Sequence, residues 1–196
     1  MERNELYPVF LKLHNMNVLI VGGGNVGLEK LSFLLKSSPI ANVEVVAPWF
    51  LPELVALVNK HHSVKLTMKK FKKKMLKKRH MVIACTDDLE VNKRIYDLSR
   101  ERYLICNIAD TPDLCDYYLG GIVTKGNVKI AISTNGKSPT TAKRLREFFE
   151  EVIPEDINKM VENLNEYRKT LKGDFEDKVQ KMNAITESLK NKEHRE

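Results

Sequence analysis

One stretch near the N-terminus constrains the fold of this chain most: an apolar run followed at once by closely spaced glycines. Val18–Val21 leads directly into the segment GGGNVG at 22–27, and leucines at helical spacing come next. This order predicts a buried strand, a tight turn and the first turn of a helix. Gly22 permits the sharp turn, Gly24 permits close approach of a pyrophosphate, and Gly27 permits close contact between helix and strand. Because the N–H groups at a helix N-terminus attract phosphate, we expect a nucleotide site here.

Size and composition indicate a globular chain with room for a hydrophobic core. It has 196 residues, of which 42% are hydrophobic and 30% are charged. No apolar run approaches the roughly 20 residues that span a bilayer, and the first residues lack the pattern of a secretion signal. We therefore expect a cytoplasmic protein that does not bind membranes. The formal net charge of +7 favours acidic partners.

Much of the basic charge lies in one run, residues 69–79. Its simplest interpretation is a solvated face between two strands, which can steer an anion without touching it. Nucleic-acid binding is the alternative, but Phe71 is the only aromatic residue in the run. Three cysteines form no disulfide framework and five histidines are scattered, so we expect no structural metal.

Between residues 18 and 110, apolar runs suited to buried strands alternate with segments of helical spacing. We expect strands at 18–21, 43–46, 64–68, 81–85 and 103–108. Strands that alternate with helices predict an α/β fold, a Rossmann-like doubly wound parallel sheet. Side chains of Thr86, Asp87 and Asp88 suit the cap of the helix after the fourth strand.

The pattern changes after residue 110. Runs at 117–123 and 128–133 flank turn residues and predict a β-hairpin. Ser138-Pro139 suits the start of a helix that ends before Pro154, and two amphipathic helices follow. The tail from Lys190 is expected to be frayed.

We therefore expect three domains. They are a dinucleotide-binding Rossmann domain at 1–112, a dimerisation hairpin and helix at 113–153, and a helical C-terminal domain at 154–196. The middle domain is too small to hold a hydrophobic core alone. It must pack on the sheet or on a second copy of the chain, and the second arrangement makes a homodimer.

Four segments coincide in order and spacing with those of a known family. They are GGGNVG with Lys30 after it, ACTDD with Asn92 after it, CNIAD at 106–110, and AISTNGKSP at 131–139 before RLRE. Together they resemble the precorrin-2 dehydrogenase family, the dehydrogenase and ferrochelatase part of sirohaem synthase. The resemblance runs from Leu11 to Pro154, and the last helices match only in character.

The resemblance implies an enzyme that passes a hydride from precorrin-2, a tetrapyrrole, to NAD and so makes sirohydrochlorin. Some members also insert ferrous iron as a second substrate, and the sequence leaves this activity open. The family's fold is a Rossmann domain, an intertwined dimerisation unit and a helical C-terminal domain, which implies a homodimer. Nothing in it calls for nucleic acid or a membrane.

By the same resemblance, the family's aspartate after the last sheet strand falls on Asp110, where it handles protons in both reactions. From the residues alone, an aspartate that caps a turn before Thr111 is the simpler interpretation. The family's Ser/Thr-rich turn falls on Ser133 and Thr134. With Lys137, these are candidates to bind substrate carboxylates, and hydroxyls that merely end a strand are the alternative.

The acid that many Rossmann domains carry at the end of the second strand is missing, because Ala47 and Pro48 stand there. This matches the family and leaves the choice between NAD and NADP open. Thr86 and Asp87, at the next strand end by the crevice, are better cofactor candidates. The residues expected at the NAD site are Gly22, Gly23, Gly24, Asn25, Val26, Gly27, Ala47, Pro48, Thr86 and Asp87.

Two departures and two alternatives remain. Gly27 stands where the family usually has alanine, and residues 116–121 replace its usual proline.

A non-enzymatic NAD-binding regulatory module would share the glycine turn and the Thr-Asp-Asp block. Such modules normally carry the missing acid and do not need the segment 133–139. A nucleic-acid-binding protein would rest on the basic run alone, since no recognition motif accompanies it.

Overall fold

The computed structural model describes residues 3–187, so the predicted frayed tail from Lys190 lies outside the described residues. Contacts group the chain into two compact units. The sheet unit holds the chain up to Gly120 together with Ser133–Pro139. The hairpin–helix unit holds Gly121–Ile132 and the chain from Thr140 onward. The division into three domains stays a prediction.

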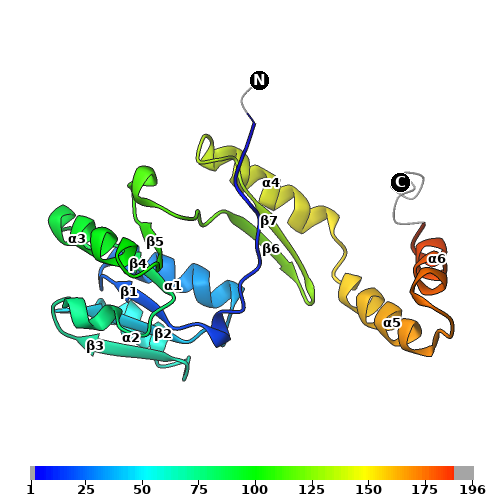
Figure 1. The fold of residues 1–196 in the computed structure, drawn as a ribbon, viewed down its shortest axis with the longest axis horizontal. Coiled ribbons are helices and arrows are strands. Elements are labelled where there is room, and N and C mark those ends of the chain that lie inside the picture. Colours follow the sequence, from blue (N-terminus) through cyan, green and yellow to red (C-terminus); the bar gives the residue numbers. More distant parts are fainter. Residues whose placement is uncertain (1–2, 188–196) are drawn as a thin grey trace. The chain divides into compact units, whose positions relative to one another are not determined.

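The sheet unit is built on five parallel strands, as the sequence predicts (Figure 1). Their order in the sheet is β3-β2-β1-β4-β5. The strands are β1 Val18–Val21, β2 Val43–Ala47, β3 Val64–Met68, β4 Met81–Ala84 and β5 Ile105–Ile108. β1 pairs with β2 on one side and β4 on the other. The strand order therefore reverses beside β1, and doubly wound sheets bind ligands in the crevice at that point.

Helices and short 3-10 turns connect the strands and cover both faces of the sheet. They are η1 Leu13–Asn15, α1 Asn25–Ser37, α2 Pro52–Val58, η2 Lys73–Leu76, α3 Leu89–Arg100 and η3 Pro112–Leu114. Val18 and Ile20 pack in a cluster with apolar residues of α1 and α2. Leu19 and Val21 pack in a second cluster with Ile95 of α3. This alternation places β1 in the centre of the core, with both faces buried.

The hairpin–helix unit contains an antiparallel pair of strands and helices. They are β6 Gly121–Lys125, β7 Val128–Ile132, α4 Pro139–Val152, α5 Ile157–Thr170 and α6 Phe175–Thr186. The hairpin turn is held on the first turn of α5, because Asn158 Oδ1 accepts a hydrogen bond from the Asn127 N–H at 2.7 Å. An ion pair between Lys125 and Glu155 reinforces this contact.

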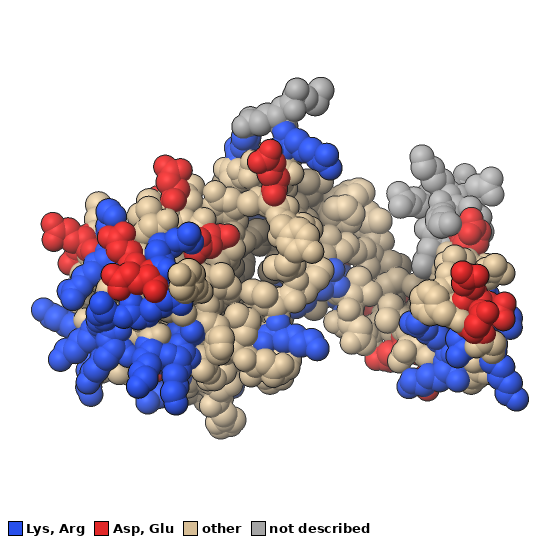
Figure 2. All heavy atoms as spheres, in the orientation of Figure 1, with Lys and Arg blue, Asp and Glu red and all other residues tan. Residues whose placement is uncertain are grey.

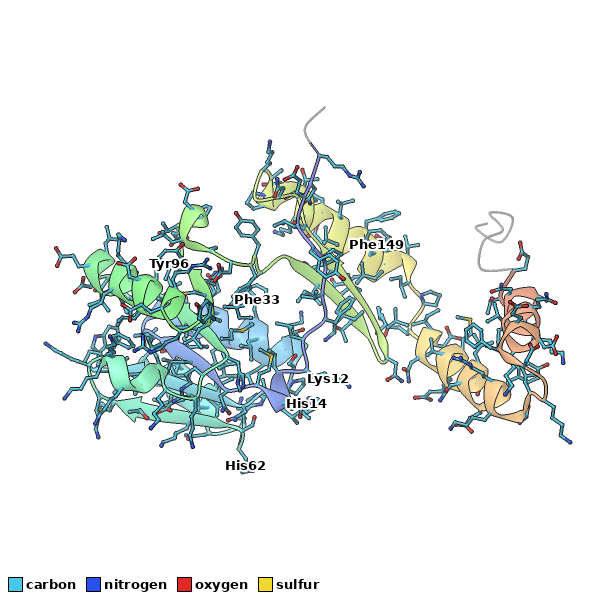
Figure 3. The ribbon with its side chains drawn as sticks, viewed as in Figure 1. Lys12, His14, Phe33, His62, Tyr96 and Phe149 are labelled. Carbon is cyan, nitrogen blue, oxygen red and sulfur yellow. The ribbon has the colours of Figure 1, made fainter. Side chains whose placement is uncertain are left out.

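An apolar stripe on α4 is only partly covered. Leu145, Phe148 and Val152, which define the α4 stripe, are all exposed, and half of the Phe148 surface is accessible. Phe149, labelled in Figure 3, packs edge to face on Phe148 with 5.4 Å between ring centroids. None of the described helices of this unit contains a fully buried residue.

Two strand predictions are wrong at their N-terminal ends. The strand expected from Tyr103 begins at Ile105, because Tyr103 has a φ of +54° and completes the turn that ends α3. The strand expected from Tyr117 begins at Gly121. The reason is that Asn107 Nδ2 donates to the Tyr117 carbonyl oxygen at 2.9 Å, which ties this segment to β5 instead. Within residues 3–187, no helix combines the length and apolarity that crossing a membrane requires.

Candidate functional site

Three of the glycines in the segment 22–27 are required by the protein's own backbone. Gly22 has a φ of +136°, and a Cβ there would lie 2.4 Å from the Cys85 carbonyl oxygen. A Cβ on Gly23 would lie 2.1 Å from the Trp49 carbonyl oxygen. A Cβ on Gly27 would lie 2.3 Å from the carbonyl oxygen of Gly22. The sharp turn and the close helix contact predicted from the sequence are both present.

Gly24 differs from these three glycines. A Cβ on it would meet only the Trp49 ring, at 3.6 Å, which is an ordinary contact. Gly24 is the N-cap of α1, no side chain caps this helix, and its first turn has no acid. In α3, by contrast, the Asp88 carboxylate accepts from the N–H groups of Glu90 and Val91 at 3.0 Å. The uncapped start of α1 and the lack of backbone crowding at Gly24 fit a phosphate group.

The connection from β2 to α2 is fastened to the glycine turn. The Leu51 N–H donates to the Gly23 carbonyl oxygen at 2.9 Å. Ala47 is buried and Pro48 is exposed, while Trp49 is 56% exposed with its indole ring beside Gly24. Sequence reasoning missed Trp49. The available signal was its place directly after the expected site residues, as the only tryptophan of the chain.

At the end of β4, Thr86 forms a closed hydrogen-bond network with Asn92. The Thr86 hydroxyl donates to Asn92 Oδ1 at 2.8 Å, and Asn92 Nδ2 donates to the Thr86 carbonyl oxygen at 2.9 Å. Asn92 is only 4% exposed, so these bonds satisfy a buried amide and fix the turn. Asp87 is exposed and its carboxylate has no hydrogen bond or ion pair within the described residues. Asp87 is therefore the side chain of this turn that is available to contact a ligand.

Asp110 follows β5 at the same edge of the sheet. It is exposed and has a φ of +58°, in the left-handed region that aspartate adopts only occasionally. Its carboxylate has no hydrogen bond or ion pair among residues 3–187. The interpretation of Asp110 as a turn-capping side chain is therefore wrong for this structure. Its carboxylate remains free to act on a ligand.

Asp116 takes the structural role that Asp110 does not. Its Oδ2 accepts a hydrogen bond from the Cys106 N–H at 2.9 Å, and its own N–H donates to the Cys106 carbonyl oxygen at 2.8 Å. Arg100 Nη1 contacts Asp116 Oδ1 at 2.7 Å. These bonds hold the segment that replaces the family's usual proline against the edge of β5.

The segment 133–138 forms a tight turn within the sheet unit. The Lys137 N–H donates to the Thr134 carbonyl oxygen at 3.0 Å, and Asn135 and Gly136 have φ values of +55° and +73°. Both values are those of a type I′ turn. The Thr134 hydroxyl accepts from the Ser138 N–H at 3.3 Å, and the Ser133 hydroxyl accepts from the Asn135 N–H at 3.1 Å. The two hydroxyls therefore shape the turn.

Burial makes the thiols of Cys85 and Cys106 unsuitable for handling protons. It raises the pKa of Cys85 to about 12, with a smaller opposite effect of Lys30. It also raises the pKa of Cys106 to about 12. Both thiols stay protonated near neutral pH and are poor nucleophiles. The exposed carboxylates of Asp87 and Asp110 are the remaining candidates at this edge.

No group of three or more metal-binding side chains gathers in the described part of the chain. His14 in η1 and His62 before β3, both labelled in Figure 3, belong to no such group. The strand order, the glycine turn at the reversal and the uncapped α1 define a dinucleotide-binding domain of the Rossmann type.

The chain belongs to the family described as "Putative NAD(P)-binding", whose model matches residues 9–121. The match supports a nicotinamide dinucleotide as the cofactor of this chain. A second model, described as "Sirohaem biosynthesis protein central", matches residues 125–151.

Curated relatives and a solved structure agree with these matches. A siroheme synthase of Pseudoalteromonas translucida is 36% identical over 168 residues, which cover 86% of this chain and 35% of the relative. That of Thioalkalivibrio sulfidiphilus is 34% identical over 173 residues, 88% of this chain and 35% of the relative. The chain thus spans about a third of the length of these relatives. The structure of "SirC, precorrin-2 dehydrogenase" superimposes with a TM-score of 0.72 at 25% identity, covering 92% of this chain and 89% of that one.

Proposed function

We propose that this chain is a homodimeric, cytoplasmic precorrin-2 dehydrogenase that converts precorrin-2 to sirohydrochlorin with NAD as the hydride acceptor. The likeness to SirC, which extends over most of both chains, supports this proposal. The observation that carries it is Asp110, a carboxylate without a partner among the described residues. It follows β5 at the same edge of the sheet as the glycine turn after β1.

The residues at this edge fit the parts of the cofactor. The N–H groups at Gly24 and at Asn25 and Val26, which begin α1, would hold the pyrophosphate. Ala47 and Pro48 lie on the adenosine side of the glycine turn, and Thr86 and Asp87 on the nicotinamide side. When bound, the nicotinamide ring supplies the acceptor for the hydride.

Asp110 handles the proton of the reaction. Oxidation of the macrocycle removes a hydride and a proton, and the Asp110 carboxylate accepts that proton. Its exposure suits contact with a substrate too large to be enclosed by the sheet edge. We assign Ser133, Thr134 and Lys137 to the substrate carboxylates, where Lys137 brings the positive charge and the two hydroxyls hold the turn in shape.

The α4 stripe supports a dimer. Leu145, Phe148 and Val152 expose apolar surface along one helix of a unit that contains few buried side chains. A second copy of the chain would cover this surface and complete the core of the unit. Ferrous iron insertion stays a prediction. It would use iron as a substrate and Asp110 to accept the pyrrolic protons.

The test follows NADH and sirohydrochlorin when purified protein is mixed with precorrin-2 and NAD. We expect the two products to form in equal amounts. The Asp110→Asn variant should be slower by about 100-fold or more, because the proton acceptor is lost, while its dissociation constant for NAD is unchanged. If NAD binds and no NADH forms, the chain is a non-enzymatic NAD-binding module and the proposal is wrong.

A further inference from the structure

The adenosine end of the glycine-turn site has no carboxylate at the usual position. In Rossmann domains that select NAD, an acid at the end of the second strand binds the 2′-hydroxyl of the ribose. Here β2 ends at the buried Ala47, and Pro48 has no N–H to donate. The one acid between Ala47 and Val58 is Glu53, which is exposed on the first turn of α2.

Two lysines, Lys69 and Lys70, follow β3 beside the end of β2. Ala47 pairs with Met68, the last residue of β3, so Lys69 and Lys70 follow directly at the carboxyl edge. The Lys69 N–H donates to the Thr67 carbonyl oxygen at 2.9 Å, which keeps the first lysine close to the strand end. Figure 2 shows Lys and Arg side chains gathered over the part of the sheet unit that contains β3.

The positive charge of Lys69 and Lys70 is not neutralised within the described residues. In the run 69–79, the ion pairs are those of Lys73 with Glu101 and of Arg79 with Glu44. Lys69 and Lys70 are exposed and form no ion pair with the part of the chain that the structure describes. They can therefore attract a phosphate without first breaking another interaction.

Trp49 offers an aromatic surface on which adenine can stack, whether the ribose carries a 2′-hydroxyl or a 2′-phosphate. Its indole ring lies beside Gly24, and the residue as a whole is 56% exposed. Stacking on an aromatic ring uses the face of a base and is independent of the substituent on the ribose. Affinity for the adenosine end would then come from stacking and positive charge. β2 ends without a carboxylate that would repel a 2′-phosphate, and its acid, Glu44, lies near the start of the strand and is paired with Arg79.

We propose that this site accepts NADP as well as NAD, with Lys69 and Lys70 attracting the 2′-phosphate and Trp49 contacting the adenine. The inference rests on the proposed function, because the glycine turn sets which end of the dinucleotide lies over β2.

The test measures dissociation constants of NAD and NADP by calorimetry and by the fluorescence of Trp49, at low ionic strength. We expect NADP to bind at least as tightly as NAD. The double variant Lys69→Glu/Lys70→Glu should raise the dissociation constant of NADP by about tenfold or more. It should change the dissociation constant of NAD by less than about threefold. The matched control is Lys74→Glu/Lys77→Glu, which makes the same charge change farther along the run. It should change both constants by less than about threefold.

Each other outcome overturns the inference in a recognisable way. If NAD binds and NADP binds more than about tenfold more weakly, the site selects NAD, and the proposed function stands without the inference. If Glu53→Gln weakens the binding of NAD but not of NADP, Glu53 takes the role of the acid that is missing at the end of β2. If both lysine double variants weaken NADP binding equally, the attraction comes from the charge of the whole run 69–79 and not from Lys69 and Lys70 in particular. If neither cofactor binds, the proposed function fails as well.

Discussion

Gly22 and Cys85 are in such close contact that a Cβ on Gly22 would come within 2.4 Å of the Cys85 carbonyl oxygen. The Gly22 N–H also donates to the Val46 carbonyl oxygen at 3.0 Å. The glycine turn is therefore wedged between the ends of β2 and β4, on either side of β1. This close contact requires a glycine at position 22.

Replacement of Gly22 by alanine should disrupt the fold. The methyl group would meet backbone atoms, and a φ of +136° is unfavourable for any residue with a side chain. We expect Gly22→Ala to lower the free energy of unfolding by about 2–4 kcal/mol. Urea denaturation followed by circular dichroism measures the change. A loss below about 1 kcal/mol would mean that the turn relaxes easily.

Two aspartates six residues apart, Asp110 and Asp116, should differ in how much stability the same substitution costs. Asp116→Asn weakens bonds to the Cys106 N–H and to Arg100, and we expect a loss of about 1–2 kcal/mol in stability. Asp110→Asn breaks no contact among the described residues and suits a left-handed backbone, so its stability should stay within about 0.5 kcal/mol of wild type. Thermal and urea unfolding of both variants provide the comparison. Equal losses would contradict the roles assigned to these carboxylates.

Glu44 should make part of the stability depend on pH. Burial raises its pKa, but hydrogen bonds from Thr67 and Arg79 and the charges of Arg79 and Lys65 outweigh burial, so the pKa lies below the ordinary value of 4.5. A carboxyl whose pKa is lower in the folded state stabilises the protein above pH 4.5. This contribution is lost as the pH falls through the lowered pKa.

The Glu44→Gln variant tests this dependence. It should be less stable than wild type at neutral pH, and the difference should shrink as the pH falls below 4.5. Unfolding in urea at several pH values measures the difference between the two proteins. A difference that is constant with pH would show that Glu44 stabilises the fold by contacts unrelated to its charge.

The α4 stripe should control association of two chains. Phe148→Asp places a charge in apolar surface that a second copy would bury, so we expect monomers in place of dimers. Phe175→Asp is the matched control, because Phe175 is an exposed apolar residue of α6 outside the stripe. Light scattering after size-exclusion chromatography gives the masses. A wild-type protein that is monomeric at all concentrations would contradict the dimer.

The elements that local sequence determines could be predicted, whereas distant contacts could not. The apolar run at Val18–Val21, the glycines after it and the cap at Asp88 each depend on neighbours in the chain, and the structure has all three. The start of β6 was misplaced because residues before Gly121 bond to β5, a strand more distant in the sequence. The position of Trp49 beside Gly24 likewise needs the turn and the β2–α2 connection to meet.

For the candidate site, the sequence predicted that Asp87 and Asp110 each follow a strand of the sheet, but it did not predict the hydrogen bonds of each side chain. Asp110 and Asp116 follow the same strand, and no pattern shows which of them caps the backbone. The structure distinguishes them, because Asp116 bonds to Cys106 while the Asp110 carboxylate has no partner in residues 3–187. In the same way, the hydroxyl of Thr86 is occupied by Asn92. Such assignments depend on hydrogen bonds that only the folded chain brings together.

Calorimetric titration of a nicotinamide dinucleotide into the wild-type protein and into Gly24→Ala tests the glycine-turn site most directly. A Cβ at Gly24 meets only the Trp49 ring at 3.6 Å, so the variant should fold normally. Its methyl group would occupy the space that the pyrophosphate needs, and binding should weaken by about tenfold or more. We predict saturable binding of one cofactor per chain to wild type and this loss in Gly24→Ala. Failure of wild type to bind either NAD or NADP, or equal affinity of the two proteins, would contradict the account.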